Sequence, residues 1–323
     1  MESWNFQSYE HFLSVIDCSK ESLKSILSKK SEFYNLYNKN KKNGVRTIYA
    51  IRPKSELYMV QQRLQRKFLS NVYLPDTVCG FRSDYSYIDF LTPHISQEQG
   101  RFYLRLDISD FFDSIQVYDL KEALDYYISD DIEAEERKKL LSELIDIVTV
   151  DEVVVQGAVT SPMISNLVFR KLDIRIERYC SNFNIKYTRY ADDMLFSGST
   201  NYIHNRKFMS AISNIISSHN FSLNYNKTLR FKNEISLNGF VVGNKLRISR
   251  SKLYELNKIM RLLKSKEQMS RKVKYRIRNQ LAGYRAFLIQ VMKSTEDERE
   301  KRKLKNKIDS IQRLMKKHES TLD

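Results

Sequence analysis

The chain has 323 residues and a mass of 38.4 kDa, which is long enough to bury a sizeable core arranged as several lobes. Its hydrophobic content of 41% is typical of a soluble globular protein, and without a run of about 18 apolar residues we expect no membrane span. The N-terminus lacks the basic start and apolar segment of a signal peptide, and the cysteines Cys18, Cys79 and Cys180 are scattered. These features predict reduced thiols and a cytoplasmic protein, with no cysteine or histidine cluster for a metal.

The formal net charge is +16, and most of it lies near the C-terminus. Residues 251–323 contain 21 Lys and Arg against 9 Asp and Glu, a difference of +12. A basic segment of this size predicts contact with the backbone of a polyanion such as a nucleic acid. The alternative is a solvated helical face that has no ligand.

The N-terminal third is expected to combine helices with one strand. Residues 5–40 have an irregular helical periodicity, which predicts one or two helices before a turn at 41–44. A strand is expected over 45–50. A helix is expected over 55–70, because apolar residues recur there at helical spacing, and turn-forming residues dominate 71–93.

The stretch 102–107 alternates between two kinds of side chain, which predicts a strand with one buried face. The face expected to be buried carries Phe102, Leu104 and Leu106. The polar face is expected to carry Tyr103, Arg105 and Asp107. Asp107 then ends the strand, and the chain turns away from it.

The central part is expected to alternate helices with short strands. Helices are predicted over 120–128 and 133–148, and a buried strand over 153–155. A loop of small residues follows, in which Gln156 can line a pocket for a flat base. Pro162 then begins a helix.

The C-terminal part is expected to begin with a helix over 202–220 and a strand over 221–224. A hairpin is predicted from 235–242 and 245–248, turning at Gly243-Asn244. From Ser251 onward the chain is expected to be helical and basic, with aromatic residues interleaved.

Two adjacent carboxylates, Asp192 and Asp193, lie between two short β-prone runs, which predicts a hairpin with the acids at its tip. Two such acids would repel each other, and Mg²⁺ is a fitting counter-ion because it favours one or two carboxylates together with substrate phosphates. Asp107 supplies a third acid. Two metal ions about 4 Å apart could then support an in-line phosphoryl transfer. The alternative is a polar turn and a strand end without chemistry.

The order of these stretches over residues 41–250 resembles the reverse transcriptase family. The resemblance is carried by Arg46-Thr47-Ile48-Tyr49, Gly80-Phe81-Arg82, Leu106-Asp107 with Phe111-Phe112, Gln156 through Pro162, Tyr190-Ala191-Asp192-Asp193, Lys227, and Leu237-Asn238-Gly239. It implies an RNA-directed DNA polymerase, a nucleotidyltransferase. Its α+β right-hand fold would have fingers, a palm with an antiparallel sheet and a helical thumb.

The resemblance also implies the division of the chain and its cofactor. The fingers with N-terminal helices are expected over 1–95, and the palm over 96–250 with fingers elements around 120–165. The basic helical thumb is expected over 251–323. Two Mg²⁺ ions, for which Mn²⁺ could substitute, are expected as the cofactor.

The residue roles that the resemblance implies fall into three groups. The catalytic, metal-binding residues are expected to be Asp107, Asp192 and Asp193. The nucleotide is expected to contact Arg46 and Lys42 or Lys41 at its triphosphate, Lys227, Gln156, and Phe112 as a steric gate against ribonucleotides. Nucleic acid is expected to contact Tyr190, Gly239, Arg276, Arg278 and Tyr284.

Within the family, the sequence most resembles bacterial retron reverse transcriptases, in its compact length and in Thr92-Pro93-His94 before the catalytic strand. This implies a structured noncoding RNA as partner and dNTPs as substrates. Priming from an RNA 2′-hydroxyl would give a branched RNA–DNA hybrid (msDNA), in antiviral defence against phage with an effector protein. The alternatives are a group II intron-like or orphan defence reverse transcriptase, or a scaffold that holds an RNA–DNA hybrid and restrains an effector.

Overall fold

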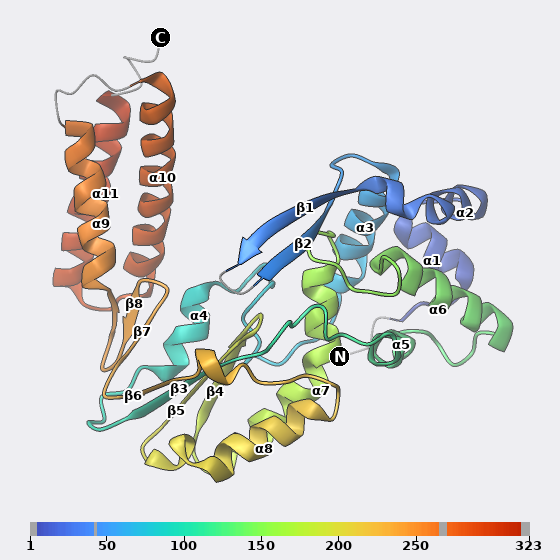
Figure 1. Cartoon of the computed structure of the whole chain (residues 1–323), viewed down its shortest axis with the longest axis horizontal. Helices are drawn as coiled ribbons and strands as arrows, with labels where there is room; N and C mark the ends of the chain where they lie inside the picture. The colour runs from blue at the N-terminus through green and yellow to red at the C-terminus, as the bar shows by residue number, and fades with distance from the viewer. Residues whose placement is uncertain (1–4, 42–43, 265–269, 318–323) are drawn as a thin grey trace. The chain divides into compact units, whose positions relative to one another are not determined.

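The computed structural model describes residues 5–41, 44–264 and 270–317 (Figure 1). The chain forms two compact units, each made of two segments. The first unit comprises Met1–Phe90 and Leu104–Arg230, and the second comprises Leu91–Tyr103 and Phe231–Asp323. The expected division into fingers, palm and thumb stays a prediction.

The first unit begins with two short helices and a long antiparallel ribbon. The helices α1 (Tyr9–Ile16) and α2 (Lys20–Ser28) each begin after a serine whose hydroxyl accepts a backbone N–H of the first turn. A 3₁₀ turn, η1 (Lys30–Phe33), leads into β1 (Tyr34–Lys41), which pairs with β2 (Gly44–Ile51). The expectation of helix up to residue 40 is therefore wrong over β1, because pairing with β2 overrides the local periodicity.

Three predicted helices of the first unit are confirmed. They are α3 (Glu56–Lys67), α5 (Val117–Asp125) and α6 (Ala134–Val148). Each turns an apolar stripe inward, as its periodicity predicts. The turn-rich segment between α3 and the next strand contains η2 (Leu69–Asn71), α4 (Tyr87–Leu91) and η3 (Thr92–His94).

A four-stranded sheet, in the order β4-β5-β3-β6, positions the acidic residues. Its strands are β3 (Phe102–Asp107), β4 (Lys186–Tyr190), β5 (Asp193–Gly198) and β6 (Leu229–Lys232). The long helix α7 (Ser161–Ser181) packs against β4 and against α8 (Arg206–Ser217), which follows η4 (Asn201–His204). In Figure 1, α7 and α8 lie on one side of the strands β3, β4 and β5.

Three strand predictions of this region need correction. The polar face of β3 is buried at Tyr103 and Asp107, which are 0% and 2% exposed, because a strand inside the sheet is covered on both faces. Residues 153–155 form a loop with one isolated bridge and an exposed Val153. Residues 221–224 also make one isolated bridge, from Leu223 to Ile108, and η5 (Tyr225–Lys227) follows. Neither stretch extends its single bridge into a ladder.

The second unit combines a small sheet with three helices. The antiparallel strands are β7 (Ile235–Leu237), β8 (Phe240–Val242) and β9 (Leu246–Ile248). The single strand expected over 235–242 is therefore wrong, because Asn238 and Gly239 take positive φ values of 48° and 90° and turn the chain. The helices α9 (Arg250–Lys264), α10 (Arg271–Ser294) and α11 (Glu298–Lys317) lie side by side (Figure 1).

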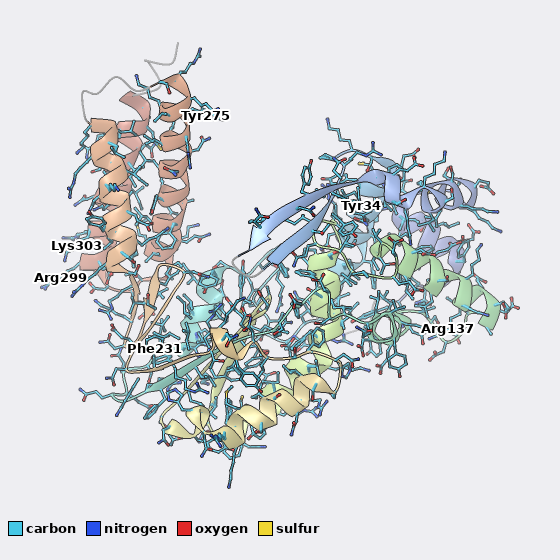
Figure 2. The ribbon with its side chains drawn as sticks, viewed as in Figure 1. Tyr34, Arg137, Phe231, Tyr275, Arg299 and Lys303 are labelled. Atoms are coloured by element: carbon cyan, nitrogen blue, oxygen red, sulfur yellow. The ribbon has the colours of Figure 1, made fainter. Side chains whose placement is uncertain are left out.

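The bundle of the second unit confirms the helical, basic C-terminal segment. Its inner faces bury Leu281 and Val291 of α10 and Ile311 of α11, while charged side chains such as Arg299 and Lys303 belong to the outer surface (Figure 2). The ring of Phe287 lies 4.6 Å from that of Phe240 and packs α10 against the small sheet. Among the described helices, none has the length and apolar character needed to cross a membrane.

Candidate active site

The turn between β4 and β5 has two residues. Tyr190 and Asp193 form the last pair of the ladder, so Ala191 and Asp192 make the tip. Ala191 takes a φ of +57°, a left-handed conformation that costs a residue with a side chain about 1–2 kcal/mol. The hairpin prediction is confirmed, and the two acids occupy different positions in it, with Asp192 at the tip and Asp193 at the first position of β5.

Backbone hydrogen bonds hold the end of β3 beside this turn. The N–H of Ile108 donates to the carbonyl of Asp192 at 2.9 Å, and the N–H of Asn224 donates to the carbonyl of Asp107 at 2.8 Å. Asp107 and Asp192, 85 positions apart in the printed sequence, therefore line the same pocket. A polymerase site requires Asp107 to lie on the same side as the hairpin tip, and this arrangement meets that requirement.

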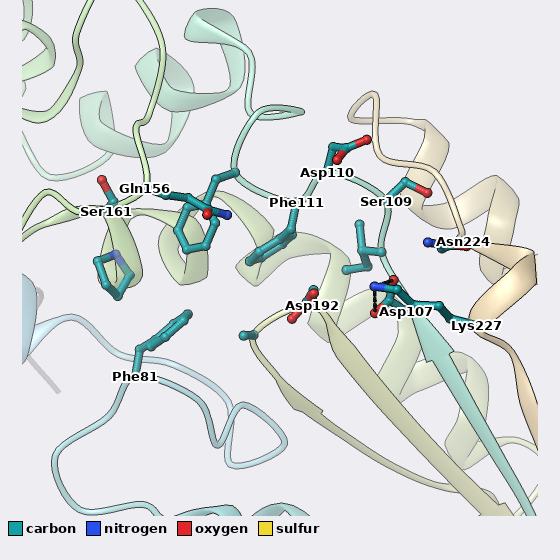
Figure 3. A pocket seen from close by; sticks show the side chains of 15 residues that line it. Phe81, Asp107, Ser109, Asp110, Phe111, Gln156, Ser161, Asp192, Asn224 and Lys227 are labelled. Atoms are coloured by element: carbon teal, nitrogen blue, oxygen red, sulfur yellow. Dashed lines mark hydrogen bonds and ion pairs between the residues drawn. The ribbon is translucent and has the colours of Figure 1, made fainter. Parts of the chain in front are cut away.

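Two basic side chains neutralise the carboxylates. The ammonium of Lys227 donates to both oxygens of Asp107 at 2.9 Å (Figure 3). The guanidinium of Arg105 donates to Asp193 through Nε at 3.0 Å and through Nη2, and Nη2 also lies 3.8 Å from Asp107. Burial raises the pKa of the Asp193 carboxyl, and Arg105 opposes this shift. Two of the three acids, Asp107 and Asp193, are thus already paired with basic side chains.

The donor set suits magnesium at Asp107 and Asp192. Both supply carboxylate oxygens to one pocket, and Mg²⁺ favours such ligands together with substrate phosphates. Within the described part of the chain, however, no three side chains of His, Cys, Asp or Glu form a group that could hold a metal ion. The convergence of Asp107, Asp192 and Asp193 on shared ions stays a prediction.

The pocket itself has a volume of about 730 Å³ and lies beside the hairpin tip (Figure 3). Its walls combine the acids with aromatic rings. It is lined by Phe81, Asp107, Ile108, Ser109, Asp110, Phe111, Phe112, Gln156, Gly157, Ser161, Pro162, Ala191, Asp192, Asn224 and Lys227. Three predicted nucleotide contacts, Phe112, Gln156 and Lys227, are therefore together with two predicted metal ligands.

The aromatic wall is built by two turns. Phe111 and Phe112 follow β3, with ring centroids 5.5 Å apart. Phe81 is a loop residue with a φ of +64°. Its ring faces that of Phe112, and the two ring centroids are 6.3 Å apart. Gly80 precedes it, and a Cβ there would lie 2.6 Å from the N atom of Ala191, so only glycine allows this approach to the hairpin tip.

The loop that carries Gln156 is fastened to β2. The carbonyl of Gln156 accepts the N–H of Tyr49 at 2.9 Å, and the carbonyl of Gly157 accepts the N–H of Ile51 at 3.4 Å. Gly157 has a φ of +113°, and a Cβ there would lie 2.4 Å from the carbonyl oxygen of Tyr49. The edge of β2 therefore fixes where Gln156 enters the pocket.

The remaining predicted residues either do not line this pocket or are outside the described part of the chain. Lys42 and the side chains of Lys41 and Arg46 fall outside the described residues. Tyr190 packs its ring against Tyr87 at 5.1 Å, away from the pocket lining. The other predicted nucleic-acid contacts are in the second unit, and they are Gly239, Arg276, Arg278 and Tyr284. Their roles stay predictions.

Sequence reasoning missed two residues that hold the site. It placed Arg105 on the same face as Asp107 without giving it a task, although alternation along β3 puts positions i and i+2 together. It also missed Asp173 of α7, which pairs with Arg189 of β4 and shares a helical face with the apolar Phe169 and Ile176. A lone acid on such a face is the signal that could have revealed a buried partner.

Comparison with known proteins assigns the class. The family profile described as reverse transcriptase (RNA-dependent DNA polymerase) matches residues 37–242. This segment is more than half of the chain, and the chain belongs to the reverse transcriptase family.

Among individual proteins, the chain is similar to two reverse transcriptases of Escherichia coli retrons. It is 31% identical to the Retron Ec86 reverse transcriptase over 188 residues, covering 56% of this chain and 54% of the relative. It is 32% identical to the Retron Ec73 reverse transcriptase over 163 residues, covering 49% and 50%. The chain thus spans about half the length of the curated relatives it matches, and the expected resemblance to retron enzymes is confirmed.

A solved structure supports the fold alone. The telomerase of Candida tropicalis in complex with a TWJ fragment of telomeric RNA aligns with a TM-score of 0.50 and 11% identity, covering 94% of this chain and 57% of that one. Together with the family match, this confirms the expected α+β polymerase fold class.

Proposed function

We propose that this protein is an RNA-directed DNA polymerase of retron type, which copies part of a partner noncoding RNA into single-stranded DNA. The single observation that supports this most is the pocket in which Asp107 and Asp192 meet Phe112 and Gln156, in a chain of the reverse transcriptase family. A pocket with carboxylates on one wall and rings on another suits a dNTP, which has a triphosphate and a flat base.

The chemistry of each pocket residue suggests its role in the reaction. Asp107 and Asp192, with Asp193 beside them, would hold Mg²⁺ ions, which when bound activate the primer hydroxyl and stabilise the leaving oxygen. Lys227 is 54% exposed and flexible enough to exchange Asp107 for phosphate oxygens of the incoming nucleotide. Gln156 would contact the nucleotide from the opposite wall. Positioning and charge neutralisation then supply most of the catalysis.

The finer proposal concerns the product and the partners. By the resemblance, the enzyme would prime from an RNA 2′-hydroxyl, yield a branched RNA–DNA hybrid and act with an effector protein in antiphage defence. The competing candidates are a group II intron-like or orphan defence reverse transcriptase and a binding scaffold. Sequencing the nucleic acid that copurifies with the protein separates them. Branched RNA-linked DNA supports the retron type, and RNA alone supports the scaffold.

The first prediction tests catalysis. We expect Asp107→Asn and Asp192→Asn each to lower dNTP incorporation on an RNA template about 100-fold or more, because each removes negative charge from the ion site. The measurement is primer extension with purified protein in Mg²⁺. Asp113→Asn is the matched control, an exposed acid of the same turn that does not line the pocket. Full activity of both pocket variants would end the proposal.

The second prediction tests the sugar gate. Phe112→Ala opens the pocket beside the sugar, and we expect discrimination against ribonucleotides to fall about 10- to 100-fold. The ratio of kcat/KM for dNTP and rNTP measures it. Phe183→Ala, at an exposed ring outside the pocket, is the control. An unchanged ratio in Phe112→Ala would remove this residue as the gate.

A further inference from the structure

A buried ion pair lies next to the hairpin tip. Arg189 of β4 and Asp173 of α7 are both 0% exposed. Their contact is bidentate, with Nε 2.8 Å from Oδ1 and Nη2 2.7 Å from Oδ2. Such a planar fork fixes the orientation of the guanidinium as well as its position.

The surroundings leave the guanidinium almost no freedom. The Tyr187 hydroxyl donates to Asp173 at 2.7 Å, and the guanidinium carbon lies 4.7 Å from the ring centre of Phe169 and 5.7 Å from that of Phe111. Burying two charges is costly, and a buried pair can often be replaced by apolar side chains without loss of stability. Stability alone therefore gives no reason for charges at these positions.

The nitrogen that Asp173 leaves free points to the tip. Arg189 Nη1 donates to the carbonyl oxygen of Ala191 at 3.0 Å. Ala191 has the left-handed φ of +57° and immediately precedes Asp192. A strained residue keeps its conformation only where its neighbours enforce it, and this hydrogen bond is one such restraint.

The backbone of Arg189 is anchored as well. Its N–H donates to the carbonyl of Thr77 at 2.7 Å, and its carbonyl accepts the N–H of Cys79 at 2.8 Å. The guanidinium therefore reaches from a fixed strand position to a fixed acid. Of the N–H groups that Asp173 does not use, one on Nη1 donates to the Ala191 carbonyl.

We propose that Arg189 is a positioning residue that sets the orientation of the Asp192 carboxylate. Oriented by Asp173, it holds the Ala191 carbonyl and keeps the two-residue turn in the form that presents the Asp192 carboxylate to the pocket. The catalytic consequence rests on the proposed function. The effect on the turn itself does not.

The test separates an effect on the conformation of the turn from an effect on the stability of the protein. The triple variant Arg189→Met, Asp173→Leu, Tyr187→Phe replaces the pair by apolar side chains and leaves only the half-buried carbonyl of Ala191 without its donor, so it is expected to fold. Arg189→Lys keeps the charge but loses the fork. Arg137→Met is the matched control, because Arg137 also pairs with an acid, Asp125, and donates to a carbonyl, that of Ser129, outside the pocket (Figure 2).

Two readouts do not depend on polymerisation. In the metal-free protein labelled with ¹³C-methyl alanine, the Ala191 methyl resonance should shift or broaden in both Arg189 variants and stay unchanged in Arg137→Met. Calorimetric titration with Mn²⁺ should show about 10- to 100-fold weaker binding in the Arg189 variants, the range seen when a group that orients a metal ligand is lost. These measurements hold even if the wild-type protein copies no RNA.

A kinetic measurement tests whether the orientation of Asp192 affects polymerisation. In both Arg189 variants kcat should fall about 10- to 100-fold and the half-saturating Mg²⁺ concentration should rise, while KM for the template–primer stays unchanged. A folded triple variant and a folded Arg189→Lys with wild-type methyl resonance, Mn²⁺ affinity and kcat would overturn the proposal. If the triple variant melts below the assay temperature, the same readouts on Arg189→Lys decide.

Discussion

Arg105 and Asp193 face each other from neighbouring strands, β3 and β5, with side chains 21% and 14% exposed. Water screens such a pair less than it screens a surface pair, so losing one partner leaves a partly buried charge unmatched. Asp107 differs, because it has Lys227 as well as Arg105 nearby. The two acids therefore depend on Arg105 to different extents.

We accordingly expect Arg105→Met to lower the free energy of unfolding by about 1–3 kcal/mol, because Asp193 loses its ion pair. Urea denaturation at pH 7 measures the effect. Lys171→Met, which breaks the exposed pair with Glu122 in the same unit, should cost less than about 1 kcal/mol. Equal losses in the two variants would show that Arg105 is not a special partner of Asp193.

At the scale of elements, the pocket depends on short loops held by regular strands. The loop of Gln156 and Gly157 is docked on β2, and the hairpin tip is held by the ends of β3 and β4. Glycine at position 157 is required both by its positive φ and by the closeness of the Tyr49 carbonyl. A side chain there would push the loop away from β2 and move Gln156.

Gly157→Ala should therefore lower the free energy of unfolding by about 2 kcal/mol or more and raise KM for dNTP. Thermal unfolding followed by circular dichroism, together with primer extension, measures the two effects. Gly283→Ala is the opposite case, since a Cβ in this part of α10 meets nothing within 4 Å. It should stabilise its helix by about 0.5–1 kcal/mol, and a destabilised Gly283→Ala would contradict this account.

At the scale of the molecule, the charge distribution predicts how nucleic acid is bound. The chain carries +16 in total, and basic residues far outnumber acidic ones after residue 250. Arg276 is exposed on α10. Its neighbour Tyr275 is exposed as well (Figure 2). Tyr284 is less available, since its hydroxyl donates to Glu255 at 2.7 Å. Phosphate contacts by such arginines release counter-ions and make binding depend on salt.

The double variant Arg276→Gln, Arg278→Gln should reduce the slope of log K against log salt concentration by about 1–2, since each lost phosphate contact removes about 0.7–0.9. Fluorescence anisotropy with a labelled RNA between low and physiological salt measures the slope. Lys20→Gln, Lys24→Gln in α2 makes the same charge change on two exposed side chains. Equal slopes in the two double variants would exclude this surface of α10 from the phosphate contacts.

Much of the fold could be predicted because its signals are local. Helices α3, α6 and α7 have apolar stripes at helical spacing, and the hairpin of β4 and β5 follows from its β-prone runs around two acids. The errors occurred where pairing overrides local preference. The sequence of β1 suits a helix or a strand until β2 pairs with it, and residues 153–155 have strand-like side chains without a partner strand.

The sequence by itself determined the family, the helices and the order of the acidic and aromatic motifs, because these depend on neighbours along the chain. Only the tertiary structure decided which cations meet the acids. Lys227 reaches Asp107 across 120 positions, Arg105 reaches Asp193 across 88, and Arg189 orients itself on Asp173. Periodicity has no information about such distant pairs, since burial and charge pairing are properties of the packed chain.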